Sequence, residues 1–334
     1  MAARPVFSVV VPVFNEAEGL PEFHRRLSAV MRRLGRWEAI YVNDGSTDAS
    51  LAVLHRLRKA DPSIAIVNLA RNFGKEVAMT AGLDHVSGDA VVVIDADLQD
   101  PPELIEALAA EWRGGYDVVY AQRRGREGET WIKKSTATAF YRVMERIGHV
   151  RLPRDTGDFR LMSRRVVEAV VSLREQHRFM KGLFAWVGFP SKAVPYDRAT
   201  RHAGDTKWNY WRLWNLALEG VTSFTVVPLR ISTYVGMGVA ALALVYGAVV
   251  VARAALFGNE VAGYPSLLTF VLFLGGIQLM TLGVIGEYLG RVFNETKQRP
   301  LYIVERFSRA GGANAAPVAD AAAADKDPFM FNPP

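Results

Sequence analysis

The chain has 334 residues, a formal net charge of +6 and no cysteine. The length allows one large domain with an appendage. The positive charge suits an anionic partner such as nucleic acid, phospholipid or a phosphorylated substrate. The lack of cysteine excludes disulfides, thiol nucleophiles and cysteine-ligated metals. A short apolar run from Val6 to Val13 is interrupted by Pro12 and lacks the organisation of a signal peptide.

Strand-like and helix-like segments alternate through the first 121 residues. Runs of β-branched and other apolar residues predict strands at 7–13, 39–42, 64–69, 90–94 and 116–121. Apolar residues at helical spacing follow each of the first four runs, as in the segment from Leu20 to Leu34. The short links between these elements predict a parallel α/β sheet covered by helices on both faces.

The fourth predicted strand ends in the polar side chains of Asp95, Asp97, Gln99 and Asp100. Open α/β sheets bind ligands at the carboxyl ends of their strands, and oxygen ligands at this spacing suit Mg²⁺ or Mn²⁺ carrying a diphosphate. Pro101 suits the first turn of a helix, with Asp100 as its N-cap. An ordinary acidic turn is the alternative. The polar ends of three other strands at the same edge favour the metal–nucleotide site.

Two segments after residue 130 are typical of a membrane surface. Residues 131–150 mix aromatic and apolar side chains with Lys and Arg. This pattern predicts an interfacial amphipathic helix or, equally, a helix packed on the sheet. Trp208, Tyr210, Trp211 and Trp214 lie within seven residues and predict an interfacial aromatic belt in a juxtamembrane helix over 208–230.

Two apolar runs, 231–257 and 264–290, are long enough to span about 30 Å of hydrocarbon. A buried hairpin in a soluble protein is the less favoured alternative. The link between the runs has no Lys or Arg, whereas basic residues flank the pair, so both termini and the N-terminal domain are expected in the cytoplasm. Glycine pairs in the runs predict close helix packing and a homo-oligomer. Residues 291–309 are expected to form a basic tail and 310–334 a disordered one.

Four motifs together resemble glycosyltransferase family 2. They are Val11-Pro12-Val13-Phe14-Asn15-Glu16, Asn43-Asp44-Gly45-Ser46-Thr47-Asp48, Arg71-Asn72-Phe73-Gly74-Lys75 and the segment from Asp95 to Glu103. The resemblance extends from about Phe7 to about Ile303. More narrowly, it is to the polyprenyl-phosphate glycosyltransferases, which include dolichol-phosphate mannose synthases and bactoprenol glucosyltransferases. It implies a GT-A (Rossmann-like), mostly parallel sheet domain over 1–207, with interfacial amphipathic helices and a two-helix transmembrane hairpin.

The resemblance implies a nucleotide and donor site formed by eight residues: Pro12, Phe14, Glu16, Asp44, Lys75, Asp95, Ala96 and Asp97. Asp95 would face the nucleotide or donor sugar, and Asp97 with Gln99 would hold Mg²⁺ or Mn²⁺. A turn-forming role is the alternative for Asp44. No GxGxxG or GxxxxGK[ST] sequence is present, which disfavours dinucleotide and P-loop sites.

The resemblance places the acceptor phosphate beside Arg123, Lys134, Arg201 and Lys207. Together with Asp95, residues Asp158, Arg201 and Lys207 form the expected catalytic set, with Asp158 as the candidate base. A structural role for Asp158 stays open, because a lipid monophosphate has a second pKa near ~6 and is already largely ionised at pH 7.

The sequence therefore predicts inverting transfer of one hexose, with glucose favoured, from a UDP-sugar to undecaprenyl phosphate. This would occur at the cytoplasmic face of the inner membrane, for modification of a cell-envelope glycan, and no nucleic acid is expected as a partner. A non-catalytic membrane-tethered scaffold for nucleotide sugars is the alternative from another class. Another sugar or a dolichol-type acceptor also remains open. A processive polysaccharide synthase is disfavoured, since no QxxRW motif is present.

Overall fold

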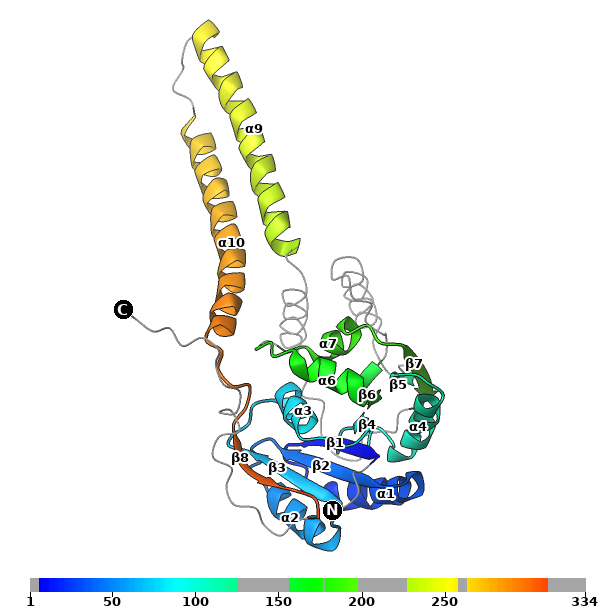
Figure 1. Ribbon diagram of the computed structural model, residues 1–334. Helices are drawn as coiled ribbons and strands as arrows, with labels where there is room; N and C mark the ends of the chain where they lie inside the picture. Colours follow the sequence, from blue (N-terminus) through cyan, green and yellow to red (C-terminus); the bar gives the residue numbers. More distant parts are fainter. Residues whose placement is uncertain (1–5, 125–155, 177, 198–226, 258–262, 312–334) are drawn as a thin grey trace, which may run out of the picture. The chain divides into compact units, whose positions relative to one another are not determined.

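The computed structural model describes residues 6–124, 156–176, 178–197, 227–257 and 263–311. These residues fall into two compact units, an α/β unit and a helical hairpin. The α/β unit is built on an eight-stranded sheet with the order β7-β5-β6-β4-β1-β2-β3-β8 (Figure 1). The predicted segments 131–150 and 208–226, Lys134, Arg201, Lys207 and the tail beyond residue 311 lie outside the described residues.

The strands of the sheet are β1 (Phe7–Val13), β2 (Trp37–Asn43), β3 (Ile64–Leu69), β4 (Ala90–Val93), β5 (Val118–Arg123), β6 (Thr156–Ser163), β7 (Ser191–Tyr196) and β8 (Val304–Ser308). The β1–β2, β1–β4, β2–β3 and β5–β7 pairs are parallel. Strands β6 and β8 pair antiparallel with their neighbours. The sheet is therefore mixed, and the prediction of an α/β sheet is confirmed with two reversed strands added.

Helices cover both faces of the sheet. They are α1 (Leu20–Leu34), α2 (Ser50–Ala60), α3 (Lys75–Asp84), α4 (Ile105–Arg113), α6 (Arg164–Ser172) and α7 (Met180–Trp186). Helix α1 contacts α2 and α4 on one face, and α3 contacts α6 on the other. Val9 and Val11 of β1 belong to the core on the α1 side. A Cβ on Gly82 of α3 would lie 2.3 Å from Val10, so glycine there lets α3 pack closely on β1.

The turn after β4 differs from the sequence prediction. A 3₁₀ turn, η1 (Pro102–Leu104), precedes α4, and neither helix start has a side-chain cap. Asp100 is therefore not the N-cap that was predicted. Its buried carboxylate instead accepts a hydrogen bond from the Tyr196 hydroxyl, because β7 brings that side chain to the same edge of the sheet.

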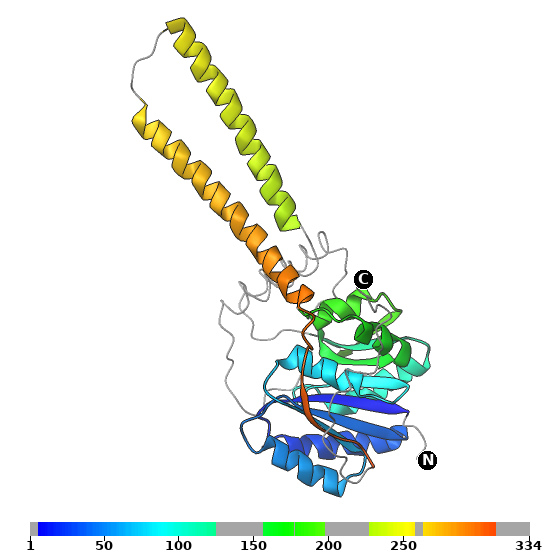
Figure 2. The same cartoon turned by 60° about the vertical axis from the view of Figure 1, so that its left-hand side comes forward.

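The hairpin consists of α9 (Val227–Phe257) and α10 (Tyr264–Thr296), which lie side by side in Figure 2. Both helices are long and apolar enough to cross a membrane. The rings of Tyr246 and Phe270 join them at a centroid separation of 4.9 Å. Large apolar side chains such as Leu242 and Leu279 remain 72% exposed, which is expected where lipid would cover them.

The segment after α10 is more than the basic tail that was predicted over 291–309. Within 291–309, the first residues complete α10, which ends at Thr296. Strand β8 then pairs with the free edge of β3 (Figure 1). The Tyr302 hydroxyl donates to Asp84 Oδ2 at 2.5 Å, and the Phe307 ring packs against His85 at 4.5 Å. The C-terminal strand is therefore an integral part of the α/β unit.

Candidate functional site

Four parallel strands bring their following loops to one edge of the sheet. Val13 at the end of β1 is paired with Asn43 of β2, and Asn43 is paired with Asn68 of β3. Val93, the last residue of β4, is paired with Val10. Because the strands are parallel, the predicted motifs that follow them meet at this edge, as is typical of ligand sites in open α/β sheets.

A charged triad of Lys75, Asp95 and Asp158 lies at this edge. Strand β6 runs antiparallel to β4 with Arg160 opposite Val93, so Asp158 is brought level with Asp95. The Nζ atom of Lys75, the first residue of α3, donates to Asp95 Oδ2 at 2.7 Å and to Asp158 Oδ2 at 2.6 Å. The structure thus brings together three residues that are far apart in the sequence and were each predicted for the site.

The triad shifts the protonation of its own members. Burial opposes the charge on Lys75, but the two carboxylates outweigh it and raise the pKa of Lys75 above its usual value. Burial also opposes ionisation of Asp158, yet Lys75 and Lys181 hold its pKa at about 2. Burial raises the pKa of Asp95 in spite of Lys75. Asp158 is therefore an ionised carboxylate, and its buried Oδ1 atom has no hydrogen-bond partner among the described residues.

Asp44 orients the loop that leads to Lys75. Its Oδ1 accepts the backbone N–H of Phe73 at 2.7 Å and its Oδ2 accepts that of Gly74 at 3.0 Å. Gly45 has φ +62°, and a Cβ there would lie 2.4 Å from the backbone of Arg71. Asp44 thus holds the distant loop before Lys75, whereas the alternative predicted a role in its own turn before Gly45 and Ser46. A carboxylate has further lone pairs with which to accept from a nucleotide.

The loop after β1 is held against the loop after β2. Asn15 has φ 56° and its Oδ1 accepts the Thr47 backbone N–H at 2.9 Å. The backbone N–H of Glu16 donates to Ser50 Oγ at 2.9 Å. Pro12 is half-buried in β1, whereas Phe14 is 46% exposed beside this loop. An exposed ring and a half-buried proline at a strand end can form one wall of a site for a planar base.

Asp97 and Gln99 form a tight turn after β4. Asp97 Oδ1 accepts the Gln99 backbone N–H at 3.0 Å, and Leu98 between them has φ 58°. Asp97 Oδ2 makes no hydrogen bond to a described residue. The preceding Ala96 is buried, and its carbonyl approaches Gly19 at the start of α1.

This turn can supply only part of a metal site. Among the residues that the structure describes, no three His, Asp or Glu side chains gather as a metal cage. Mg²⁺ is commonly held by one or two carboxylates and completed by substrate phosphate and water. The free Oδ2 of Asp97 fits such a divalent ion carried by a diphosphate.

Arg123 belongs to a second polar group at the same edge. Its Nε lies 3.5 Å from the Tyr196 hydroxyl, which also donates to Asp100. Burial, followed by the carboxylate of Asp100, raises the pKa of Tyr196 to about 12. A Cβ on Gly157 would lie 3.5 Å from the Arg123 guanidinium, so Arg123 sits beside the start of β6.

Three charged residues that sequence reasoning did not single out surround Asp158. Glu76 Oε2 accepts the Met180 backbone N–H at 2.7 Å. Burial, and then the charge of Asp158, raise the pKa of Glu76 to about 7. Arg160 lies 3.9 Å from the centroid of the Phe184 ring, and burial lowers its pKa to about 10. Lys181 follows Met180 on α7. No spacing in the sequence signals that α7 closes over β6.

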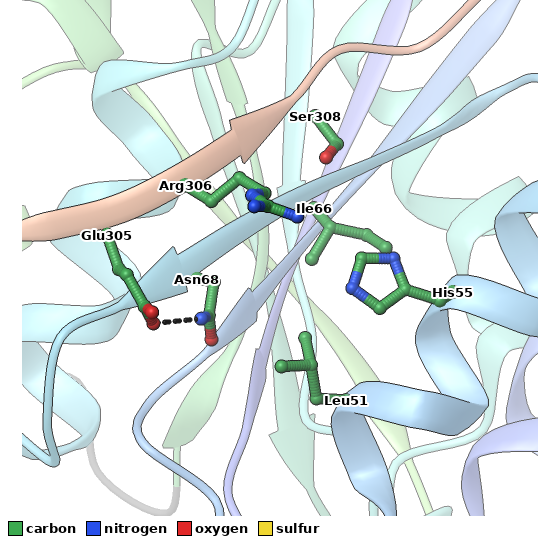
Figure 3. Close-up of a pocket in the computed structure, with 7 residues that line it drawn as sticks. All are labelled: Leu51, His55, Ile66, Asn68, Glu305, Arg306 and Ser308. Atoms are coloured by element: carbon green, nitrogen blue, oxygen red, sulfur yellow. Dashed lines mark hydrogen bonds between the residues drawn. The ribbon is translucent and has the colours of Figure 1, made fainter. Parts of the chain in front are cut away.

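A separate pocket of about 190 Å³ lies between α2, β3 and β8 (Figure 3). Its seven lining residues are Leu51, His55, Ile66, Asn68, Glu305, Arg306 and Ser308. Glu305 accepts a hydrogen bond from the Asn68 amide at 2.6 Å, which closes one side of the pocket. None of the predicted site residues lines it, so it is distinct from the site built around the triad.

Comparisons with known proteins identify the family of the chain. The model of "Glycosyl transferase family 2" matches residues 8–171, and that of "GtrB C-terminal hairpin" matches residues 227–292. An uncharacterized glycosyltransferase of Synechocystis is 52% identical over 298 residues, which cover 89% of this chain and 94% of that protein. The prophage bactoprenol glucosyl transferase homolog of Escherichia coli K12 is 48% identical over 304 residues, covering 90% and 99%.

Among solved structures, the mannosyltransferase PcManGT of Pyrobaculum calidifontis, in complex with GDP-Man and Mn²⁺, aligns with a TM-score of 0.45. It is 18% identical and the alignment covers 86% of this chain and 88% of that one.

Proposed function

This chain belongs to glycosyltransferase family 2, and we propose that it transfers one glucose residue from UDP-glucose to a polyprenyl phosphate. Its α/β unit has the GT-A fold. The charged triad carries the proposal, because it holds a lysine between two carboxylates at the ligand edge of the sheet. Relatives named bactoprenol glucosyl transferase, about 48% identical over nine tenths of the chain, support glucose and a polyprenyl acceptor.

The donor would lie across the ends of β1, β2 and β4. Pro12, Phe14 and Glu16 would border the base, and the remaining lone pairs of Asp44 would accept from base or ribose. Asp95 and Ala96 would face the ribose or the sugar, while Lys75 would balance charge near the diphosphate. Asp97, with Gln99, would hold Mg²⁺ or Mn²⁺. Such an ion, when bound, stabilises the negative charge on a leaving diphosphate.

The reaction is a single in-line displacement. An oxygen of the lipid phosphate attacks the anomeric carbon of glucose, and the bond from that carbon to the β-phosphate oxygen of UDP breaks. UDP leaves with the bonding electron pair, so the configuration at the anomeric carbon inverts. The attacking phosphate is already largely ionised at pH 7. Positioning and electrostatic stabilisation would therefore supply most of the rate.

Asp158 serves better to fix Lys75 than to remove a proton. An effective general base has a pKa near the working pH, whereas the pKa of Asp158 is held at about 2. Its Oδ2 is also occupied by the Lys75 ammonium at 2.6 Å. Asp158 would therefore keep Lys75 in place beside the reacting phosphates. Arg123, Lys134, Arg201 and Lys207 stay predicted ligands of the acceptor phosphate.

The hairpin of α9 and α10 would anchor the enzyme in the inner membrane. Their length and apolar surface suit two membrane crossings. The basic flanks favour a cytoplasmic catalytic unit and cytoplasmic termini. A lipid-linked acceptor would then meet a soluble donor at the membrane surface. A homo-oligomer, expected from the glycines of these helices, stays a prediction.

The test uses the purified full chain with a short-chain polyprenyl phosphate and a panel of radiolabelled nucleotide sugars. We expect UDP-glucose to label an organic-extractable lipid, and NMR of that product to show the inverted anomer. Label from another sugar alone would overturn glucose, and a retained anomer would overturn the single displacement. Donor binding without any labelled lipid would favour the non-catalytic scaffold.

A further inference from the structure

We propose that Lys181, on α7, binds the phosphate of the acceptor and neutralises its charge. The inference rests on the proposed function and adds a phosphate ligand that the sequence motifs did not indicate. It follows from the contacts that hold α7, from the lack of a described hydrogen-bond partner for the Lys181 ammonium, and from the charged groups around that ammonium.

Two contacts hold α7 against the site. At its start, the Met180 backbone N–H donates to the Glu76 carboxylate of α3 at 2.7 Å. One turn later, the Phe184 ring lies 3.9 Å from the guanidinium carbon of Arg160 on β6. Lys181 lies between these contacts in the sequence and is half-buried. Its side chain is thus carried by a helix that is fixed to both α3 and β6, next to Asp158.

The ammonium group of Lys181 has no polar partner among the residues that the structure describes. Burial lowers the pKa of Lys181, and the nearby Asp158 only partly opposes this. Lys75, in contrast, already donates to two carboxylates at 2.6 and 2.7 Å. A half-buried cation that no described residue pairs is a natural ligand for an incoming phosphate, since pairing would offset its loss of hydration.

The assignment to the acceptor rather than the donor follows from the roles that the proposed function gives to the neighbouring groups. The charged groups that act on Lys181 most strongly are Asp158 and Arg160 of β6 and Lys75 and Glu76 of α3. The turn of Asp97 and Gln99, where a diphosphate-bound metal would be held, follows β4 instead. Because the proposed function gives Lys75 and this turn to the donor diphosphate, the Lys181 cation is assigned to the acceptor phosphate.

The test compares Lys181→Met, which keeps length but removes charge, with the charge-retaining Lys181→Arg. Lys59→Met, at an exposed position on α2, is the matched control. We expect Lys181→Met to raise the KM for polyprenyl phosphate about tenfold or more, the usual effect of losing a charged hydrogen bond. The KM for UDP-glucose should change less than about twofold. Lys181→Arg should recover most of the acceptor affinity, and the control should match the unsubstituted enzyme.

Unchanged acceptor KM would overturn the proposal, and a raised donor KM with unchanged acceptor KM would assign Lys181 to the diphosphate instead. A measurement on the unsubstituted chain covers the case in which Lys181→Met fails to fold. Acetylation of Lys181, followed by mass spectrometry, should be slowed by polyprenyl phosphate and not by UDP. The reverse protection pattern would also overturn the proposal. Absence of any transfer by the unsubstituted enzyme would instead count against the proposed function.

Discussion

The Nζ atom of Lys75 lies 2.6 Å from Oδ2 of Asp158, although the two residues are 83 positions apart. This ion pair joins the N-terminus of α3 to the reversed strand β6. It also explains why Asp158 stays ionised, because an adjacent ammonium favours the charged carboxylate. The reacting phosphates would therefore meet a lysine whose position is fixed from two sides, by Asp158 and by Asp95.

Lys75→Met should lower kcat/KM by about 100-fold, equivalent to roughly 3 kcal/mol of transition-state stabilisation. The substitution removes the cation and leaves two carboxylates that repel each other. Lys75→Arg should retain a larger share of the activity, because it keeps the charge. Lys192→Met is the control, since Lys192 forms a similar 2.8 Å ion pair with Glu111 on the α4 side of the sheet. The measurement is kcat/KM for UDP-glucose in each variant. Equal losses in Lys75→Met and Lys192→Met would contradict a special role for Lys75.

Asp158→Asn should lower kcat/KM at every pH without moving the acid limb of its pH profile. The pKa of Asp158 is about 2 in the folded protein, so this group stays ionised from pH 5 to 9 and cannot cause a limb there. Any limb near pH ~6 would come from the acceptor phosphate. The measurement is kcat/KM over that range for both proteins. Loss of the acid limb in the variant would restore Asp158 as the general base.

Glu76→Gln should stabilise the protein at pH 8. The folded-state pKa of Glu76 is about 7, above the ordinary value of 4.5. The folded state therefore binds the extra proton between these values, and stability falls as pH rises through that window. The amide removes this penalty and can still accept from the Met180 N–H. We expect a gain of about 1–2 kcal/mol at pH 8 that shrinks towards pH 4.5.

Thermal unfolding of the full chain in detergent at pH 5 and pH 8 would measure the effect of Glu76→Gln. Glu22→Gln is the control, because Glu22 is an exposed partner of Arg25. A variant that is less stable than the unsubstituted protein at pH 8 would mean that the charge of Glu76 is needed more than its burial costs.

The sequence was informative where the chemistry is local. Alternating apolar runs predicted β1 to β5, and Asp95, Asp97 and Lys75 lie at the edge where they were expected. Prediction from the sequence failed where segments that are distant in the chain pack together. β8 has the mixed sequence Val-Glu-Arg-Phe-Ser and pairs with a strand more than 230 residues earlier, so no local pattern announces it. The same holds for Lys181, because only tertiary packing brings α7 to Asp158.

Tyr302→Phe should destabilise the α/β unit by about 1 kcal/mol, the typical net value of a hydrogen bond. The lost hydroxyl donates to Asp84, which also accepts two hydrogen bonds from Arg174 at 2.8 and 2.9 Å. Asp84→Ala should cost more, since it leaves the Arg174 guanidinium without its carboxylate. Tyr116→Phe, at a more exposed tyrosine, is the control. Equal unfolding midpoints for Tyr302→Phe and the unsubstituted protein would show that this contact does not help to hold β8.

Asp97→Ala should lower the transfer rate to about a thousandth of the unsubstituted rate or less. The reason is that several kcal/mol of charge stabilisation depend on the metal that Asp97 would hold. Chelation by EDTA should have the same effect on the unsubstituted enzyme, and added Mg²⁺ or Mn²⁺ should restore it. Added metal should not rescue Asp97→Ala. Asp48→Ala offers a matched control, since that carboxylate also accepts backbone N–H groups at a strand-end loop, from Ala17 and Ser50. Transfer that persists in both EDTA and Asp97→Ala would refute a divalent metal in this reaction. Transfer lost in EDTA but retained in Asp97→Ala would place the metal on other ligands.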